Sequence, residues 1–384
     1  MRFEFATANQ IIFGAGRLPE IGPVARGYGS RALIATNLAP EQAASLVEVL
    51  DTHGLTGTIF QIHNEPTIEV VNQGKNLSLA EGCELVIGFG GGSAIDCAKA
   101  VAALTTNPGE VIDYLEVIGA GRPLVQPPLP CLAVPTTAGT GAEVTRNAVL
   151  SSLAQQVKVS LRSPLMLPRL ALVDPELTYR LPPALTASTG MDALTQLIEP
   201  YTCNRPNPVT DTLCVDGIRR AGHALLTAYE NGDDPLAREE MSLASLFGGL
   251  ALANARLGAV HGFAGVLGGM YAAPHGAICA RLLPFVMEVN LRALQARSPL
   301  DPNIRRYEEV ARVLTGSPQA QAVDGVAWVI EAGRRMNIPP MAAYGVSRSD
   351  LPGIIEKSAQ ASSMKGNPIL LSFQEMEEIL ERAL

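Results

Sequence analysis

The side chains best suited to hold a metal ion lie in the second half of the chain. His261 falls within a long run of small residues, and His275 follows 14 residues later in the segment Ala273-Pro274-His275-Gly276. Upstream, Asp192 and Gln196 stand four residues apart, which puts both side chains on one face of a helix. Two imidazoles and a carboxylate make an open site for Zn²⁺ or Fe²⁺, which would polarise a carbonyl or hold an alkoxide. Taken alone, the spacing also fits histidines that only pack in a core and a carboxylate near a helix N-terminus.

A phosphate-binding turn is indicated in the first half of the chain. The apolar run Leu85–Phe89 leads into Gly90-Gly91-Gly92-Ser93 and then into a helix-like segment that carries Asp96 and Lys99. Glycines let the backbone approach a ligand closely, and a helix N-terminus offers free N–H groups and a partial positive charge. Together they suit a pyrophosphate, although a plain glycine turn gives the same pattern.

A second loop of small and hydroxyl residues, PTTAGTGAEVT over 135–145, follows the apolar run Cys131–Val134. Its hydroxyls and backbone N–H groups suit phosphate and ribose contacts, whereas a Thr-rich surface loop is the simpler alternative. Both loops come just past a buried strand, and ligands of open α/β sheets bind at those strand ends. The two loops therefore support each other as a nucleotide site.

The elements that must position these groups change in kind near Leu181-Pro182-Pro183. Before that point, short apolar runs alternate with helical spacing, which predicts a parallel sheet covered by helices on both faces. The expected strands are 32–36, 58–61, 85–89, 131–134 and 170–173, and the expected helices are 40–51, 67–80 and 94–104. Beyond it we expect almost no strands and the small-residue-rich helices 188–201, 208–228, 237–260, 279–295, 307–314, 320–336 and 372–384. The sequence thus predicts an α/β dinucleotide-binding domain over 1–180 and an all-α metal- and substrate-binding domain over 181–384.

Composition narrows the class of protein further. With 384 residues, 47% of them hydrophobic and 17% charged, the chain can bury a large core and suits two domains, while its net charge of −8 argues against a nucleic-acid partner. We expect no signal peptide and no membrane span, and we interpret the apolar tract 247–269 as a buried helix. The six cysteines include no CxxC pair and predict reduced, buried thiols in a cytoplasmic protein.

Several motifs together resemble the iron-containing (group III) alcohol dehydrogenases, with features of the related glycerol dehydrogenases. The motifs are GGGS-x-x-D-x-A-K at 90–99, PTT-x-GTG-x-EVT at 135–145, GMDA-x-x-x-x-IE at 190–199, PHG at 274–276, IIFG at 11–14 and GNP at 366–368. They span almost the whole chain, and their combination is specific.

The resemblance implies a Rossmann-like domain joined to a helical domain, in a dehydroquinate synthase-like architecture with the active site in the cleft between them. It implies hydride transfer between the nicotinamide of NAD or NADP and a small-molecule alcohol or aldehyde, a divalent iron or zinc ion, and a homodimer or larger assembly. The family's metal ligands map to Asp192, Gln196, His261 and His275, of which Asp192, His261 and His275 form the expected catalytic set. The expected cofactor contacts are Asn37, Gly91, Gly92, Ser93, Asp96, Thr136, Thr137, Thr140 and Lys158.

Three positions depart from the family pattern. Gln196 replaces a histidine. Because an amide oxygen is a harder and weaker ligand than an imidazole, we expect zinc, or weak metal retention, in preference to tightly held iron. Gly265 replaces a second histidine, which in the family is thought to relay the alcohol proton. Without that histidine the relay is left to water or the cofactor ribose. The pocket is also wider, which favours a bulkier substrate or carbonyl reduction. Asn37 stands where NAD-preferring members often carry an aspartate, so NADP(H) should be tolerated.

Alternatives remain open from the sequence. A metal-independent reductase of an activated carbonyl, resembling the maleylacetate reductases, is disfavoured by the retained Asp192, His261 and His275. A cyclising lyase like 3-dehydroquinate synthase is disfavoured because we find no Lys/Arg cluster near the metal motifs. The substitutions at Gln196 and Gly265 also fit a homologue that binds nucleotide with weakened catalysis.

Overall fold

The computed structural model describes residues 2–152, 154–155 and 157–384. These residues form two compact units. The α/β unit comprises Ala6–Thr137 and Gly141–Thr178, and the helical unit comprises Tyr179–Leu384 together with Ala138–Thr140 and the described residues before Ala6.

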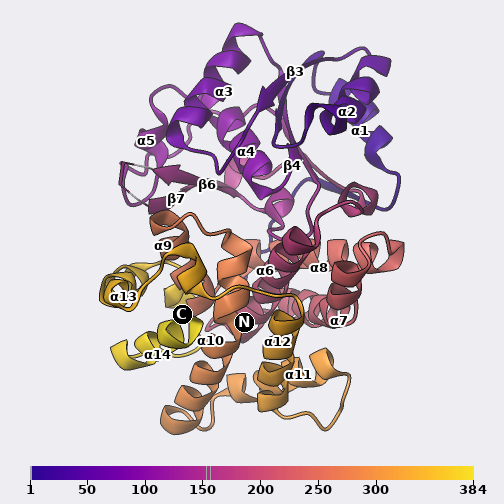
Figure 1. Cartoon of the computed structure of the whole chain (residues 1–384). Helices are drawn as coiled ribbons and strands as arrows, with labels where there is room; N and C mark the ends of the chain where they lie inside the picture. The colour runs from indigo at the N-terminus through magenta and orange to yellow at the C-terminus, as the bar shows by residue number, and fades with distance from the viewer. Residues whose placement is uncertain (1, 153, 156) are drawn as a thin grey trace. The chain divides into compact units, whose positions relative to one another are not determined.

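The α/β unit is built on a six-stranded sheet of order β1-β8-β5-β4-β2-β3, in which all neighbouring strands are parallel. Two of these strands, β3 and β4, are labelled in Figure 1. Its strands are β1 (Gln10–Phe13), β2 (Arg31–Thr36), β3 (Thr56–Gln61), β4 (Leu85–Gly90), β5 (Cys131–Pro135) and β8 (Leu170–Val173). Its helices are α1 (Ile21–Arg26), α2 (Pro40–Thr52), α3 (Ile68–Ala80), α4 (Gly92–Thr106) and α5 (Val111–Tyr114). The predicted parallel sheet is confirmed, and the sequence reasoning missed β1, α1 and α5.

Alternating side chains of the central strand face two different cores. Val86 of β4 packs in one cluster with α3 and α4, whereas Leu85 and Ile87 pack in another with α1 and α2. Every residue of β4 is buried. A parallel strand buried on both faces reads as an unbroken apolar run, which is why this strand is visible in the sequence.

A two-stranded antiparallel hairpin, β6 (Asn147–Ser152) and β7 (Val157–Arg162), lies outside the main sheet. Its inward side chains, including Ala148 and Leu161, join the cluster that contains α4. Neither strand was predicted from the sequence, although β7 reads VKVSLR and alternates apolar with polar residues.

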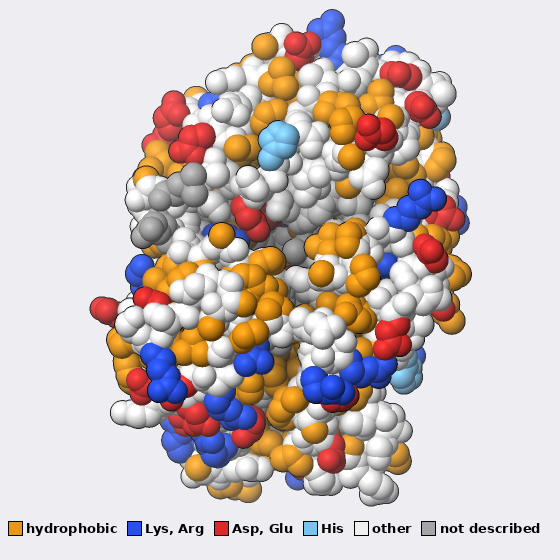
Figure 2. Space-filling view, in the orientation of Figure 1, with side chains coloured by type: hydrophobic (Ala, Val, Ile, Leu, Met, Phe, Trp, Pro, Cys, Tyr) orange, Lys and Arg blue, Asp and Glu red, His pale blue; other side chains and the backbone are white. Residues whose placement is uncertain are grey.

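The helical unit contains α6 (Pro183–Thr202), α7 (Pro208–Glu230), α8 (Pro235–Asn254), α9 (Ala259–Met270), α10 (His275–Arg297), α11 (Pro302–Thr315), α12 (Ala322–Arg335), α13 (Leu351–Gln360) and α14 (Phe373–Ala383). α6 packs against α7, α8 and α10 and is buried on all sides from Gly190 to Thr202. Acidic and basic side chains are interspersed on this unit (Figure 2), with ion pairs between α10 and α14 such as Arg292–Glu378. The predicted all-helical second half is confirmed.

The single helix predicted over 237–260, and the single buried helix expected over 247–269, are wrong. The chain leaves α8 after Asn254, and α9 starts at Ala259 with its axis bent by 95° from that of α8. Gly258 is in extended backbone at the break. A Cβ on Gly366 would lie 2.1 Å from the carbonyl oxygen of Leu257, so a distant segment presses against the break at backbone distance.

In the described part of the chain, no single helix is both long enough and apolar enough to cross a bilayer. The bent pair α8 and α9 together reaches that length and mean hydropathy, by length and composition only. All six cysteines lie within the described residues, and each is buried and outside any disulfide. The predicted reduced, buried thiols are therefore confirmed.

Candidate active site and metal centre

Three helices bring predicted metal-binding side chains to one point. Asp192 comes from α6, His261 from the first turn of α9, and His275 is the first residue of α10. Oδ1 of Asp192 lies 3.5 Å from Nε2 of His261 and 3.7 Å from Nε2 of His275. Two nitrogen or oxygen ligands on a tetrahedral zinc ion are ~3.3 Å apart. The three atoms therefore have the spacing of an open metal site.

Close packing of α10 on α6 fixes this convergence. A Cβ on Gly276 would lie 2.2 Å from the backbone oxygen of Ser188, so only glycine fits beside α6 one residue after His275. The ring centroids of His261 and His275 are 5.4 Å apart and the rings are tilted by 51°. The two imidazoles thus converge edge-on toward Asp192 and do not stack face to face.

The carboxylate of Asp192 has the character of a metal ligand. The residue is only 2% exposed, and its Oδ1 makes no hydrogen bond within the described residues. Burial raises the pKa of Asp192, but the imidazoles of His275 and His261 and the thiol of Cys279 outweigh it, so that the net pKa lies below the ordinary value. Buried carboxylates in proteins are paired with cations or coordinate metal ions. The residues present therefore fit a divalent ion.

Glu199, seven residues after Asp192 on α6, orients His261. Its Oε2 lies 2.6 Å from Nδ1 of His261, and its Oε1 accepts a hydrogen bond of 2.7 Å from the backbone N–H of Val260. Because a carboxylate only accepts, Nδ1 carries the proton and Nε2 is the atom directed at Asp192. Burial lowers the pKa of His261, but Asp192 and Glu199 raise it to about 9, so an incoming metal must displace a proton.

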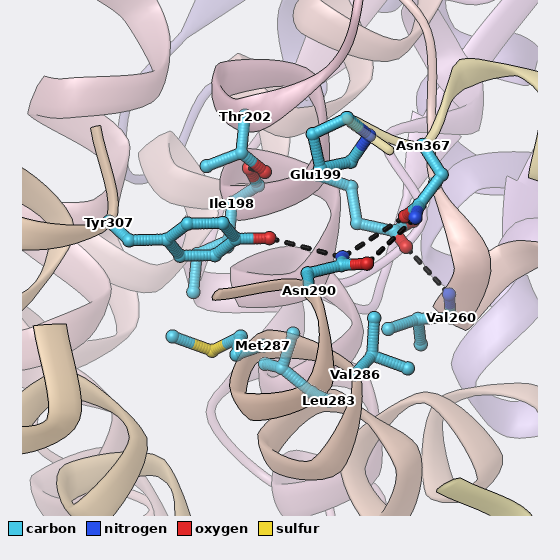
Figure 3. A pocket seen from close by; sticks show the side chains of 12 residues that line it. Ile198, Glu199, Thr202, Val260, Leu283, Val286, Met287, Asn290, Tyr307 and Asn367 are labelled. Atoms are coloured by element: carbon cyan, nitrogen blue, oxygen red, sulfur yellow. Dashed lines mark hydrogen bonds between the residues drawn. The ribbon is translucent and has the colours of Figure 1, made fainter. Parts of the chain in front are cut away.

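A buried network of polar side chains contacts the start of α9 (Figure 3). Oδ1 of Asn367 accepts hydrogen bonds from the backbone N–H of Ala259 and from Nδ2 of Asn290, and Asn290 also donates to the hydroxyl of Tyr307. A cavity beside Glu199 leaves about 10 Å³ for the centre of a water molecule, close to the minimum that one water needs. The cavity is too small for a substrate, and the network is a support for the metal ligands.

Sequence reasoning missed two members of this site. Glu199 lay within a recognised motif without a role, although its spacing of seven from Asp192 places it on the same helix face. Cys279, four residues after His275 on α10, offers a sulfur within 4.8 Å of the ligand atoms of Asp192, His261 and His275. That spacing of four was equally visible in the sequence.

The other two predicted positions of the helical unit have different surroundings. Gln196 is buried, and its Nε2 donates a 3.0 Å hydrogen bond to the carbonyl of Gly139, which ties the amide to the loop segment that packs with the helical unit. Gly265, one turn after His261, is open: a Cβ there would meet no described atom within 4 Å. The space for a larger side chain at this position therefore exists.

In the α/β unit, the predicted nucleotide residues gather where the strand order reverses, between β2 and β4. The N–H of Gly91 donates to Oδ1 of Asn37, which follows β2, at 3.1 Å. The N–H of Thr136 donates to the carbonyl of Gly90, and a Cβ on Gly91 would lie 3.7 Å from Oγ1 of Thr137. Gly91 precedes α4, which starts at Gly92 with Ser93 in its first turn. Open parallel sheets bind ligands at such a reversal.

Asp96 and Lys99 make contacts within the protein. Asp96 accepts a hydrogen bond from the N–H of Val149 and pairs with Lys99 at 2.9 Å. Lys99, fully buried, also donates to the carbonyl of Ala142 and to Oγ1 of Thr145, so it fastens the second loop to α4. The structure thus gives this pair a role in shaping the loop.

The remaining predicted cofactor residues are dispersed. Lys158 stands on β7, where its Nζ pairs with Glu65 at 3.2 Å. Thr140 groups with the helical unit and not with the sheet that carries Thr136 and Thr137.

Fold and site together indicate a metal-dependent dehydrogenase: a parallel sheet with a glycine turn at its switch point, and a helical unit with a metal-binding cluster. The family model for iron-containing alcohol dehydrogenases matches residues 8–175, and the model for the C-terminal part of that family matches 186–384. The chain belongs to the iron-containing alcohol dehydrogenase family.

Individual relatives cover almost the whole chain. Alcohol dehydrogenase 4 from Saccharomyces cerevisiae (strain YJM789) is 34% identical, covering 97% of this chain and 96% of that protein. 1,3-Propanediol dehydrogenase from Klebsiella pneumoniae is 32% identical, covering 99% and 98%. Among solved structures, a 1,3-propanediol oxidoreductase matches with a TM-score of 0.92 at 31% identity over 100% of both chains. The chain is therefore an NAD-linked, metal-dependent oxidoreductase of alcohols and aldehydes, which confirms the expected class of enzyme, fold and cofactors.

Proposed function

We propose that the chain reduces aldehydes to primary alcohols, and catalyses the reverse reaction, at a metal ion held by Asp192, His261 and His275. The observation that carries this proposal is the buried Oδ1 of Asp192, which makes no hydrogen bond among the described residues and faces two imidazole nitrogens at 3.5 and 3.7 Å. We propose Gln196 only as a weaker, additional oxygen ligand, because its amide nitrogen is already bonded to Gly139.

Each residue of the site then has a distinct task. A divalent ion, when bound, supplies Lewis acidity toward the substrate oxygen. Asp192 provides the negative charge that retains the ion, and Glu199 holds the ring of His261 so that Nε2 faces Asp192. Gly265 has no side chain that could relay the alcohol proton, so we assign that relay to water or to the cofactor ribose.

For the cofactor, we propose that residues 1–180 form the dinucleotide-binding domain and residues 181–384 the metal- and substrate-binding domain. The pyrophosphate would lie over Gly91, Gly92 and Ser93 at the start of α4, where backbone N–H groups and the helix dipole favour an anion. The further proposed contacts are Asn37, Asp96, Thr136, Thr137, Thr140 and Lys158. Asn37 carries no charge that would repel a 2′-phosphate, so NADP(H) should be accepted beside NAD(H).

For the substrate, we propose aldehydes bulkier than those preferred by relatives with a histidine at the position of Gly265. The support is the open space around Gly265, where a Cβ would meet no described atom within 4 Å. We further propose that the enzyme is cytoplasmic, assembles as a homodimer or larger homo-oligomer, and requires neither nucleic acid nor a membrane.

The test is the oxidation of NADH and NADPH with a graded series of aldehydes, by chelator-treated enzyme before and after addition of Zn²⁺ or Fe²⁺. We expect turnover only after metal is restored, and its loss in Asp192→Asn, in which one neutral amide replaces the carboxylate. Full turnover by the metal-free enzyme would favour the maleylacetate reductase-like alternative, and no turnover with any metal would favour a homologue that only binds nucleotide.

A further inference from the structure

We propose that Cys279 supplies a fourth, thiolate ligand to the metal ion, which makes this a mixed carboxylate, imidazole and thiolate site that prefers zinc to iron. The proposal rests on the metal-binding function proposed above. It concerns a residue of this chain that the motif pattern does not assign, and it explains how the site is completed where Gln196 replaces a histidine.

Cys279 lies on α10, close to the expected metal ligands. It follows His275 by one helical turn, so both side chains lie on the same face of α10. Sγ of Cys279 lies 3.6 Å from Nε2 of His275 and within 4.8 Å of the ligand atoms of Asp192 and His261. With Zn–S bonds of ~2.3 Å and Zn–N bonds of ~2.0 Å, a sulfur and a nitrogen on one tetrahedral zinc are ~3.5 Å apart. The observed spacing matches that requirement.

A second observation, on Asp192, favours a cation among these atoms. Oδ1 of Asp192, in a residue that is 98% buried, makes no hydrogen bond within the described chain. Glu199 holds the Nδ1 side of His261, which leaves its Nε2 for the same point. An oxygen, two nitrogens and a sulfur thus surround one position, and four ligands are the usual number for zinc.

Gln196 competes poorly for the fourth position. Its Nε2 donates to the carbonyl of Gly139 at 3.0 Å, and this bond restrains the whole amide. An amide oxygen is also neutral, whereas a thiolate brings a negative charge and a soft, polarisable donor. Cys279 is fully buried on the helix that already carries His275, so no rearrangement of the backbone is needed.

Ligation changes the bonding at sulfur. The S–H bond of Cys279 breaks, its proton leaves to the solvent, and the electron pair left on sulfur forms the bond to the metal. No oxidant or reductant takes part. Because thiolate ligands favour Zn²⁺ over harder ions, the protein should retain zinc in preference to Fe²⁺ when both are offered.

The experiment is a titration of chelator-treated full-length enzyme with Co²⁺, followed by absorption spectroscopy. A thiolate on Co²⁺ gives a near-ultraviolet charge-transfer band that nitrogen and oxygen ligands do not give, while visible d–d bands report binding by any ligand set. We expect wild type to show both kinds of band at one Co²⁺ per chain. Cys279→Ala should keep the d–d bands and lose the charge-transfer band, with zinc affinity lowered by roughly tenfold or more.

The matched control is Cys214→Ala, which removes another buried helical thiol of the same unit outside the site, on α7. It should retain the charge-transfer band. Wild-type enzyme that binds Co²⁺ with d–d bands alone would overturn the role of Cys279 and leave the proposed function intact. Enzyme that binds no Co²⁺ would overturn both. A folded Cys279→Ala that keeps the charge-transfer band would also overturn the inference.

Discussion

Nδ1 of His261 lies 2.6 Å from Oε2 of Glu199, and this contact links the first turn of α9 to the middle of α6. The same carboxylate accepts a hydrogen bond from the N–H of Val260, so it fixes both the ring and the backbone beside it. A metal-bound histidine is commonly oriented through its second nitrogen in this way.

Glu199→Gln should weaken metal binding by roughly 10- to 100-fold, because an amide that presents its N–H₂ toward Nδ1 no longer sets the ring orientation. The measurement is a competition titration of zinc against a chromogenic chelator. Glu331→Gln, a charge loss at an exposed ion pair with Arg334, is the control and should leave zinc affinity unchanged. Equal affinities for Glu199→Gln and wild type would remove the orienting role assigned to Glu199.

Gly265→His should shift activity toward small alcohols. The position has room for a side chain, and an imidazole there could relay the alcohol proton while it fills the pocket. We expect kcat/KM for ethanol to rise about tenfold or more and kcat/KM for a bulky aromatic aldehyde to fall. The idea fails if small alcohols gain little and the wild type does not turn over bulky aldehydes at all.

Asn37→Asp should change the choice of cofactor with little change in stability. A carboxylate can still accept the hydrogen bond from the N–H of Gly91, but its charge repels the 2′-phosphate of NADPH. We expect kcat/KM for NADPH to fall by roughly tenfold or more relative to NADH, at an energetic difference of about 1.4 kcal/mol per tenfold. An unchanged ratio would place Asn37 away from the adenosine ribose, as would a wild-type preference for NADH of several hundred-fold.

Glu143→Gln should remove part of the pH dependence of stability. Burial raises the pKa of Glu143 from 4.5 to about 7, so the folded state holds this proton more tightly than the unfolded state. The associated stability is present below pH 4.5 and is lost as pH rises to about 7. Between these pH values the free energy of unfolding of the variant should rise relative to that of wild type, by as much as about 3 kcal/mol. Urea unfolding across this range measures the difference, and parallel curves for the two proteins would contradict the assigned protonation.

What the sequence could predict was local. The buried strand Leu85–Gly90 is an unbroken apolar run, and the glycine turn, Asp192, His261 and His275 fall in recognisable motifs. The hairpin β6–β7 also has a local signal in its second strand, because Val157–Arg162 reads VKVSLR and alternates apolar with polar residues; this alternation was not used in the sequence analysis.

What the sequence could not predict depends on partners far along the chain. The spacing of Glu199 from Asp192 places it on the metal-binding face of α6, but its contact with His261, 62 residues away, is not predicted by any local pattern. The break between α8 and α9 depends on Asn367, 108 residues beyond Ala259, because its side chain accepts the N–H at the start of α9. Gly258 lowers helix propensity at the break, but Gly248 and Gly262 do the same inside α8 and α9, so local propensity does not single out where the stretch 247–269 is interrupted.

The proposed metal site is tested most sharply by anomalous diffraction at the zinc absorption edge from crystals of the zinc-reconstituted enzyme. We expect one strong peak per chain, within ~2.3 Å of Oδ1 of Asp192, Nε2 of His261 and Nε2 of His275. A peak at another place in the chain, or no peak in protein that has been loaded with zinc, would contradict it.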